Sequence, residues 1–222
     1  DSTLLLDLDR ALPAGSRRSL LSRSAKRVVI LVTKEAHCLG DILMKVYDGS
    51  LTLDIAAIVG NHPELAELAE RFGIPYHYIS HEGLSRSEHE FALQQVIKPY
   101  QPEYLILAKF MRILTADFVA QYRNRIINIH HSFLPAFIGA KPYQQAFERG
   151  VKIIGATAHF VNDQLDEGPI IEQDIARVSH IHSVEDFIMK GRDLERMVLA
   201  RAIKLHAERK TIVYNNKTVV FA

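Results

Sequence analysis

The sequence has almost no cysteine and no excess of either charge. Its 222 residues include a single cysteine, Cys38, which excludes an internal disulfide framework and any cysteine-rich zinc module. Lys and Arg number 27 against 26 Asp and Glu, so the basic excess of nucleic-acid binders is missing. No apolar run approaches the roughly 20 residues of a membrane helix. We therefore expect a cytoplasmic protein with neither a nucleic-acid nor a membrane partner.

The remaining composition is that of a globular domain, with 48% hydrophobic and 24% charged residues. Residues 1–26 differ from the rest, because a short run of leucines gives way to a polar, basic stretch broken by Pro13 and Gly15. We interpret residues 1–26 as a linker or the remnant of an upstream domain, and residues 27–222 as one domain.

The central part of the chain alternates between two hydrophobic patterns. Segments of helical spacing separate five apolar or β-branched runs: residues 28–32, 53–59, 74–79, 104–108 and 125–129. This alternation predicts an α/β fold with a doubly wound, mainly parallel, Rossmann-like sheet. Three further elements are predicted after residue 150: a hairpin-like pair of extended segments at 152–161 and 169–178, a long helix at 183–209 and a closing hairpin at 211–221.

Open parallel sheets bind ligands at the carboxyl ends of their strands, so the loops after the strands are informative. The loop after the first strand, residues 33–40, has only one glycine, which argues against a dinucleotide site. His37 and Cys38 are neighbours in this loop, and we expect that they do not converge on one small ligand. A structural or capping role is our expectation for both.

The loop after the fourth predicted strand is unusually apolar. It contains Phe110, Met111, Ile113 and Leu114, with Arg112 among them. Such a segment can wall a pocket for a flat aromatic ligand, or it can simply pack into the core; periodicity leaves both open.

The segment after the fifth strand carries the strongest chemical signal. Strand alternation places Asn128 and His130 on the same side, where an amide and an imidazole can converge on one oxygen and form an oxyanion site. A purely structural histidine is the alternative. His131 should point to the opposite face of the strand, and no carboxylate or cysteine follows at ligand spacing, so we expect no metal here.

A carboxylate cluster occupies the loop from Asn162 to Gly168. Such a loop is usually a solvated turn. It would matter for chemistry only if it folded back over Asn128 and His130, which sequence spacing cannot decide.

Together, these motifs resemble the formyltetrahydrofolate-dependent formyltransferase family over about residues 27–205. The matching motifs are Asn128-Ile129-His130 with Ser132, Leu134-Pro135 and Gly139, then Gly155-x-Thr157-x-His159-Phe160-Val161, and Asp166-x-Gly168-Pro169-Ile170. Residues 110–114 match the family's pterin pocket. The resemblance implies a formyltransferase-type fold with a catalytic centre of Asn128, His130 and Asp166. It also implies a set of substrate-binding residues: Phe110, Met111, Arg112, Ile113, Leu114, His159 and Gly168.

Two departures point to one branch of that family. Transferases acting on glycinamide ribonucleotide have a Gly-Ser-Asn phosphate loop after the first strand, and a proline where this chain has His131. Both differences resemble the formyltetrahydrofolate deformylases, the hydrolases of the family. Those enzymes also carry a small N-terminal ACT regulatory domain, of which residues 1–26 would be the tail.

The resemblance therefore implies an enzyme that hydrolyses 10-formyltetrahydrofolate to formate and tetrahydrofolate. In that reaction Asn128 and His130 would stabilise the oxyanion and Asp166 would hold the water. The alternatives are a formyltransferase that passes the formyl group to an amine, and a non-catalytic folate-binding protein.

Several further expectations accompany this reading. We expect no metal and no cofactor beyond the folate substrate. Lys109 and Arg112 could face either the glutamate tail of the substrate or solvent, and we expect both to stay outside the catalytic set. We also expect a homo-oligomer, since the helix at 183–209 and the hairpin at 211–221 could both support self-association. The roles of His37, Cys38 and His131 stay open.

Overall fold

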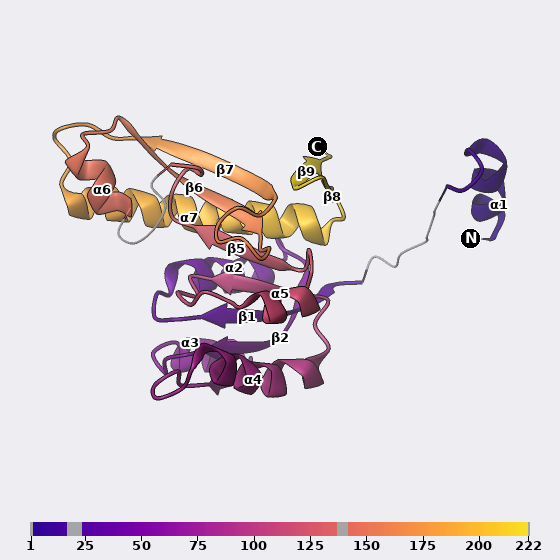
Figure 1. Cartoon of the computed structure of the whole chain (residues 1–222), viewed down its shortest axis with the longest axis horizontal. Helices are drawn as coiled ribbons and strands as arrows, with labels where there is room; N and C mark the ends of the chain where they lie inside the picture. Colours follow the sequence, from indigo (N-terminus) through magenta and orange to yellow (C-terminus); the bar gives the residue numbers. More distant parts are fainter. Residues whose placement is uncertain (1, 17–23, 137–141, 222) are drawn as a thin grey trace.

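The computed structural model describes residues 2–16, 24–136 and 142–221 (Figure 1). Seven strands form one sheet in the order β3-β2-β1-β4-β5-β6-β7. The strands are β1 (Lys26–Val32), β2 (Leu53–Gly60), β3 (Tyr76–Tyr78), β4 (Tyr104–Ala108), β5 (Ile126–His130), β6 (Ile153–Phe160) and β7 (Ile170–Arg177). The first five run parallel, whereas β6 is antiparallel to β5 and to β7. The predicted doubly wound, mainly parallel sheet is thus confirmed.

Helices cover both faces of this sheet. They are α2 (His37–Tyr47), α3 (Ala66–Arg71), α4 (Arg86–Ile97), α5 (Ala116–Gln121), α6 (Pro142–Glu148) and α7 (Val184–Ala207), with a short 3-10 turn at Lys98–Tyr100. One apolar core lies between the sheet and α2, α3 and α7, and a second between the sheet and α4 and α5. Figure 1 shows α7 running alongside β6 and β7.

The strand β1 explains why two cores form. Its Val-Val-Ile-Leu-Val run is fully buried, and successive side chains enter opposite cores: Val28 and Ile30 face α2 and α7, while Val29 and Leu31 face α4. A continuous β-branched run is therefore what a central strand covered on both sides requires.

Two helices begin directly after a residue whose side chain caps the helix N-terminus. Thr115 accepts a hydrogen bond from the backbone N–H of Phe118, and the Phe118 side chain is buried, as the sequence predicts for α5. The long helix α7 begins after Ser183, which forms a capping box with Asp186. The predicted closing hairpin is also present, as β8 (Thr211–Tyr214) and β9 (Lys217–Val220).

Two elements differ from the sequence prediction. The helix α1 (Ser2–Ala11) lies where a linker was expected, with Leu4 and Leu6 more than half exposed. The helix α6 lies where no element was expected. Assignment of residues 1–26 to an ACT-like remnant and of 27–222 to the catalytic domain stays a prediction. Within the described residues, no helix has the length and apolar character to cross a membrane.

Candidate active site

A cavity of about 630 Å³ gathers most of the predicted site residues. It is walled by the segments that follow β4, β5 and β6. Its lining includes Asn128, His130, Asp166, His159 and the whole segment from Phe110 to Leu114. Residues 110–114 thus line the cavity, although Phe110 and Leu114 also pack into the second core. The acidic loop does fold back to the two β5 residues. The structure resolves both questions that sequence spacing left open.

Asn128 is oriented by the neighbouring strand. In the antiparallel pair of β5 and β6, Asn128 lies opposite His159, and its Nδ2 is 3.2 Å from His159 Nε2. On its other side, His159 Nδ1 lies 2.9 Å from the carbonyl oxygen of Phe160. A carbonyl can only accept, so Nδ1 carries the proton and Nε2 accepts from the Asn128 amide.

This arrangement requires a neutral His159. Burial lowers the pKa of His159, which keeps the imidazole uncharged. One amide hydrogen of Asn128 is then used by His159, and the second is left to donate into the cavity. The predicted substrate-binding residue His159 therefore lies against Asn128 and fixes its rotamer.

His130 and Asp166 form the second half of the site. Nδ1 of His130 lies 3.3 Å from Oδ2 of Asp166. The other ring nitrogen, Nε2, is buried and has no hydrogen-bond partner among the described residues. Unpartnered buried polar atoms are rare and costly, which marks this nitrogen as a group kept for a ligand.

Asp166 is held in its ionised form. Burial opposes ionisation, but the hydrogen bond and charge of His130, with smaller effects of His159 and His131, lower the pKa of Asp166 below its ordinary value. Its second oxygen, Oδ1, is 3.7 Å from His159 Nε2, too long for a hydrogen bond. That oxygen is therefore placed to accept from a water molecule.

The loop that carries Asp166 is tied down at two places. Gly168 packs against β6 so closely that a Cβ would lie 1.7 Å from the carbonyl oxygen of Phe160. In addition, Asn216 Nδ2, in the turn between β8 and β9, donates to the carbonyl of Glu167 at 2.9 Å. Asp166 itself has a left-handed backbone, φ +58°. Gly168 is thus a close-approach position beside the cavity lining rather than part of it.

The pocket wall is anchored at both ends. At one end the Met111 N–H donates to Oγ1 of Thr33 at 3.0 Å. At the other, the backbone N–H of Thr115 donates to Oε1 of the buried Glu90 at 2.6 Å, and its hydroxyl donates to Oε2. Between these anchors, Met111 is 57% exposed, an apolar surface open to a ligand.

Lys109 differs from its prediction. We expected its side chain to face the substrate's glutamate tail or solvent, but Lys109 is only 6% exposed, has φ +62° and places Nζ 3.2 Å from Oε2 of Glu195. The same residue also lines the cavity. Arg112, in contrast, is half-buried in the wall, and Arg86 of α4 also reaches the cavity. Sequence reasoning missed Arg86, because one charged residue on a helix carries no local signal.

The expectation that His37 and Cys38 do not converge was wrong, whereas nothing contradicts the structural role expected for both. Among the described residues, donor atoms of His37, Cys38 and Glu195 all lie within 4.8 Å of one another, so the two neighbours do converge. Because α2 begins at His37, the two side chains leave a helix rather than an extended loop. His37 Nε2 lies 2.7 Å from Glu195 Oε2, and burial raises the pKa of the Cys38 thiol.

Glu195, from the middle of α7, already has three polar partners. His37 and Lys109 contact its Oε2, and the Tyr143 hydroxyl donates to Oε1 at 2.7 Å. Burial disfavours the charge, but these partners lower the pKa of Glu195 well below its ordinary range. Glu35 completes the group at 4.0 Å from Lys109 Nζ. We call Glu35, His37, Lys109, Tyr143 and Glu195 the buried ion cluster.

His131 also departs from the prediction of opposite faces. Its ring stacks on that of His130 at 5.1 Å with an interplanar angle of 25°. Alternation fails because β5 ends at His130 and the chain turns there. Burial, with the charges of Lys109 and His130, lowers the pKa of His131 to about 4. His131 is therefore a neutral imidazole at the cavity wall.

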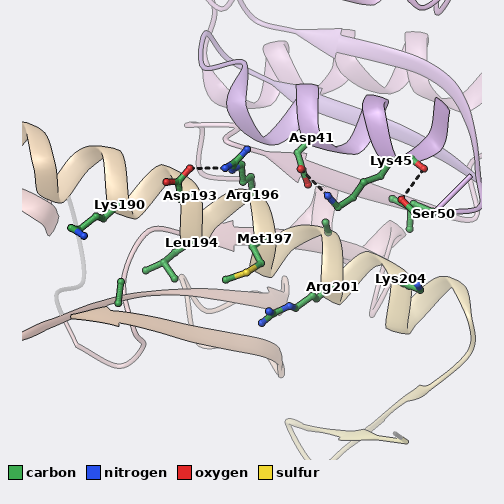
Figure 2. A pocket seen from close by; sticks show the side chains of 13 residues that line it. Asp41, Lys45, Ser50, Lys190, Asp193, Leu194, Arg196, Met197, Arg201 and Lys204 are labelled. Carbon is green, nitrogen blue, oxygen red and sulfur yellow. Dashed lines mark hydrogen bonds and ion pairs between the residues drawn. The ribbon is translucent and has the colours of Figure 1, made fainter. Parts of the chain in front are cut away.

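A second large groove, of about 640 Å³, lies between α2 and α7 and is shown in Figure 2. Four of its charged side chains form two pairs within the groove: Lys45 with Asp41 at 2.9 Å, and Arg196 with Asp193 at 2.8 Å. Arg201 and Lys204 pair with Asp174 and Glu208 outside it. None of the predicted site residues lines it. The groove therefore offers no catalytic grouping.

Comparison with known proteins shows which family has this sequence and this fold. Residues 26–203 match the family model described as formyl transferase. The chain is 60% identical over 220 residues to the formyltetrahydrofolate deformylase of Escherichia coli O6:H1, covering 99% of this chain and 79% of that protein. A solved formyltetrahydrofolate deformylase from Pseudomonas syringae superimposes with a TM-score of 0.87 at 44% identity, covering 90% of this chain and 67% of that one.

Transferases of the same fold are more distant in sequence. The glycinamide ribonucleotide transformylase 1 of Symbiobacterium toebii superimposes with a TM-score of 0.86, covering 95% of this chain and all of that one, at only 29% identity. Backbone similarity alone does not separate the two activities, but sequence similarity does. The chain belongs to the formyl transferase family, in the branch of the formyltetrahydrofolate deformylases.

Proposed function

We propose that this chain hydrolyses 10-formyltetrahydrofolate to formate and tetrahydrofolate, with water as the nucleophile. The observation that carries the proposal is the unpartnered, buried Nε2 of His130, in a ring whose Nδ1 contacts Asp166 and which lines one cavity with Asn128. Hydrolysis of a formamide needs a free hydrogen-bond donor for the oxyanion, together with an amide donor and a carboxylate that can take a proton from water.

The reaction follows from these positions. Water held by Oδ1 of Asp166 attacks the formyl carbon and gives its proton to that carboxylate. The oxyanion that forms accepts hydrogen bonds from Nδ2–H of Asn128 and Nε2–H of the His130 imidazolium. Asp166, on Nδ1, stabilises that imidazolium. Loss of one such donor costs about 10²–10³ in rate.

Collapse of the tetrahedral intermediate breaks the bond between carbon and N10. The departing N10 needs a proton, which Nε2 of His130 gives. Nε2 of His130 then regains a proton from solvent, Asp166 releases to solvent the proton that it took from water, and formic acid leaves and ionises to formate. Positioned proton transfer of this kind contributes about 10²–10⁴ in rate.

The pocket wall suits the rest of the substrate. Met111 and Ile113 present apolar surface for a flat ring, while Arg112 and Arg86 supply positive charge for an anionic tail. We propose no resident cofactor and no metal in this reaction. Action in the cytoplasm and assembly into a homo-oligomer also belong to the proposal.

The test is to incubate the protein with 10-formyltetrahydrofolate and no amine, and to measure formate and tetrahydrofolate. Stoichiometric release of both, absent in Asn128→Ala, supports the proposal. No release by a protein that demonstrably binds the folate contradicts it. The second candidate, transfer to an amine, is favoured only by the shared fold at 29% identity.

A further inference from the structure

We propose that the buried ion cluster closes the place where a second substrate would enter, so that water is the only nucleophile to reach the formyl carbon. This inference rests on the proposed hydrolysis and identifies the residues that make the enzyme a hydrolase. Lys109 is the specificity-determining residue, and Glu195 is the group that positions it.

The sheet topology shows where a second substrate would bind. From β1 the chain moves outward to β2 and β3, and then returns to the other side of β1 as β4. Such a reversal leaves a crevice at the carboxyl ends of the two central strands, which is where open α/β sheets bind ligands. In this chain that crevice lies after Val32 of β1 and Ala108 of β4.

The ion cluster occupies this position. His37 follows β1, Lys109 follows β4 directly, and Glu195 reaches them from α7. His37 and Lys109 contact the same oxygen, Oε2, at 2.7 and 3.2 Å. A crevice that could hold a ligand is thus filled by the chain's own charged side chains, each satisfied by another.

The buried ion cluster also lies next to the cavity in which the reaction is proposed to take place. Lys109 lines the cavity that holds Asn128, His130 and Asp166, while its Nζ belongs to the cluster. His131, stacked on His130, extends the wall toward Tyr143, with 6.2 Å between the ring centres. The cluster and the catalytic residues therefore share one wall, and an acceptor on the cluster side would have to displace Lys109.

A metal ion is the other occupant that the His37, Cys38 and Glu195 grouping suggests. The ammonium group of Lys109 already lies beside the carboxylate that would bind it, and the Cys38 thiol is raised in pKa by burial. Deprotonating that thiol and displacing a paired ammonium group would both cost free energy. The geometry therefore favours an internal cation over a bound one.

The balance of the reaction shows what opening the crevice would permit. An amine would attack the same formyl carbon, form a new C–N bond and lose one proton. The bond to N10 would break, and N10 would gain one proton. No oxidant or reductant is involved, so the outcome depends only on which nucleophile reaches the carbon.

Two variants separate bulk from charge. Lys109→Gly removes the side chain, and glycine suits φ +62° without strain. Lys109→Met removes only the charge and keeps a side chain of similar length in the crevice. Should Lys109→Gly fail to fold because Glu195 loses a partner, Lys109→Gly/Glu195→Gln carries the same test without the buried charge.

The probe is 2,2,2-trifluoroethylamine, a weakly basic amine that is largely uncharged at neutral pH. Each folded variant is incubated with 10-formyltetrahydrofolate and rising amine. Formate is assayed, and the N-formyl amine is followed by fluorine NMR against a protein-free control. We expect wild type and Lys109→Met to give formate alone. We expect Lys109→Gly to form the N-formyl amine at roughly ten times the amount in the protein-free control or more.

Three results would overturn the inference: N-formyl amine made by wild type, none made by a folded, folate-binding Lys109→Gly or the double variant, or equal amounts made by Lys109→Met and Lys109→Gly. The proposed function fails separately. It fails if wild type releases no formate in the absence of amine, whatever the variants transfer.

Discussion

The amide of Asn128 donates a hydrogen bond to Nε2 of His159 across the antiparallel pair of β5 and β6, at 3.2 Å. The reversal of strand direction at β6 makes this contact possible, since it places His159 opposite Asn128 in register. His159 is itself fixed by its bond to the Phe160 carbonyl. The Asn128 amide, which donates to the oxyanion, is thus oriented by the neutral imidazole of His159, and that imidazole is in turn held by a backbone carbonyl.

This orientation predicts a specific effect for His159→Phe. The phenyl ring keeps the bulk but cannot accept the amide hydrogen bond, so Asn128 can rotate. We expect kcat to fall roughly tenfold or more with little change in KM. This loss should be smaller than the 10²–10³ loss expected for Asn128→Ala. The measurement is steady-state formate release. If the losses in kcat add up in the double variant His159→Phe/Asn128→Ala, the two residues act independently, and this would contradict the positioning role of His159.

Asp166→Asn should bind folate but lose most turnover. The amide keeps the shape of the carboxylate, yet it can neither take a proton from water nor stabilise the His130 imidazolium. We expect kcat to fall by about 10²–10⁴. Binding is followed by titration with a folate that lacks the formyl group. Turnover near that of wild type would remove Asp166 from the mechanism.

The wall anchor at Glu90 should affect substrate binding. Glu90→Gln leaves one Thr115 donor facing an amide hydrogen, while Thr115→Ser keeps both bonds and serves as the matched control. We expect Glu90→Gln to raise KM for the folate and to lower the free energy of unfolding by about 1–3 kcal/mol. Urea unfolding and initial rates measure the two effects. An unchanged KM in a destabilised variant would limit Glu90 to stability.

The hairpin turn should matter for turnover although it lies outside the cavity. Asn216→Gly keeps the left-handed backbone, φ +56°. It removes the amide whose Nδ2 donates to the Glu167 carbonyl and whose Oδ1 lies 3.4 Å from Asn162 Nδ2. We expect a severalfold fall in kcat with Tm nearly unchanged, because the Asp166 loop loses one tether. Lys217→Ala, an exposed neighbour, is the control. Equal rates for the two variants would contradict the tether.

Stability should fall as the solution is acidified below neutral pH. Burial, with the charge of Lys26, lowers the pKa of His206 to about 4, and His131 is lowered similarly. The unfolded chain takes up these protons near pH 6.5 but the folded chain only near 4, so stability is lost across that window. Each histidine costs about 2 kcal/mol by pH 5.

Urea unfolding at pH 7.5 and 5 measures this loss. His206→Gln should lose less stability than wild type over the same interval, since one of the two histidines is gone. An identical loss in the variant would mean that His206 does not contribute.

The sequence predicted elements whose pattern is local. The β-branched run at 28–32 favoured a strand buried on both faces, and the two-residue spacing of Asn128 and His130 placed them on one side. Arrangements that depend on distant partners were not predictable. Lys109 reads as a surface lysine until Glu195, far along the chain, is placed beside it.

The prediction for the side-chain direction of His131 was wrong for a different reason. Strand alternation assumes that the strand continues, and β5 ends one residue earlier. A boundary error of one residue thus reversed the expected direction of a side chain at the cavity wall.

The backbone at Lys109 already has the left-handed conformation that glycine adopts without strain. A change to glycine there would require no rearrangement of the main chain. If the ion cluster does select water, the evolutionary distance between hydrolysing a formyl group and passing it on is a matter of one side chain's volume, and the catalytic residues need not change at all.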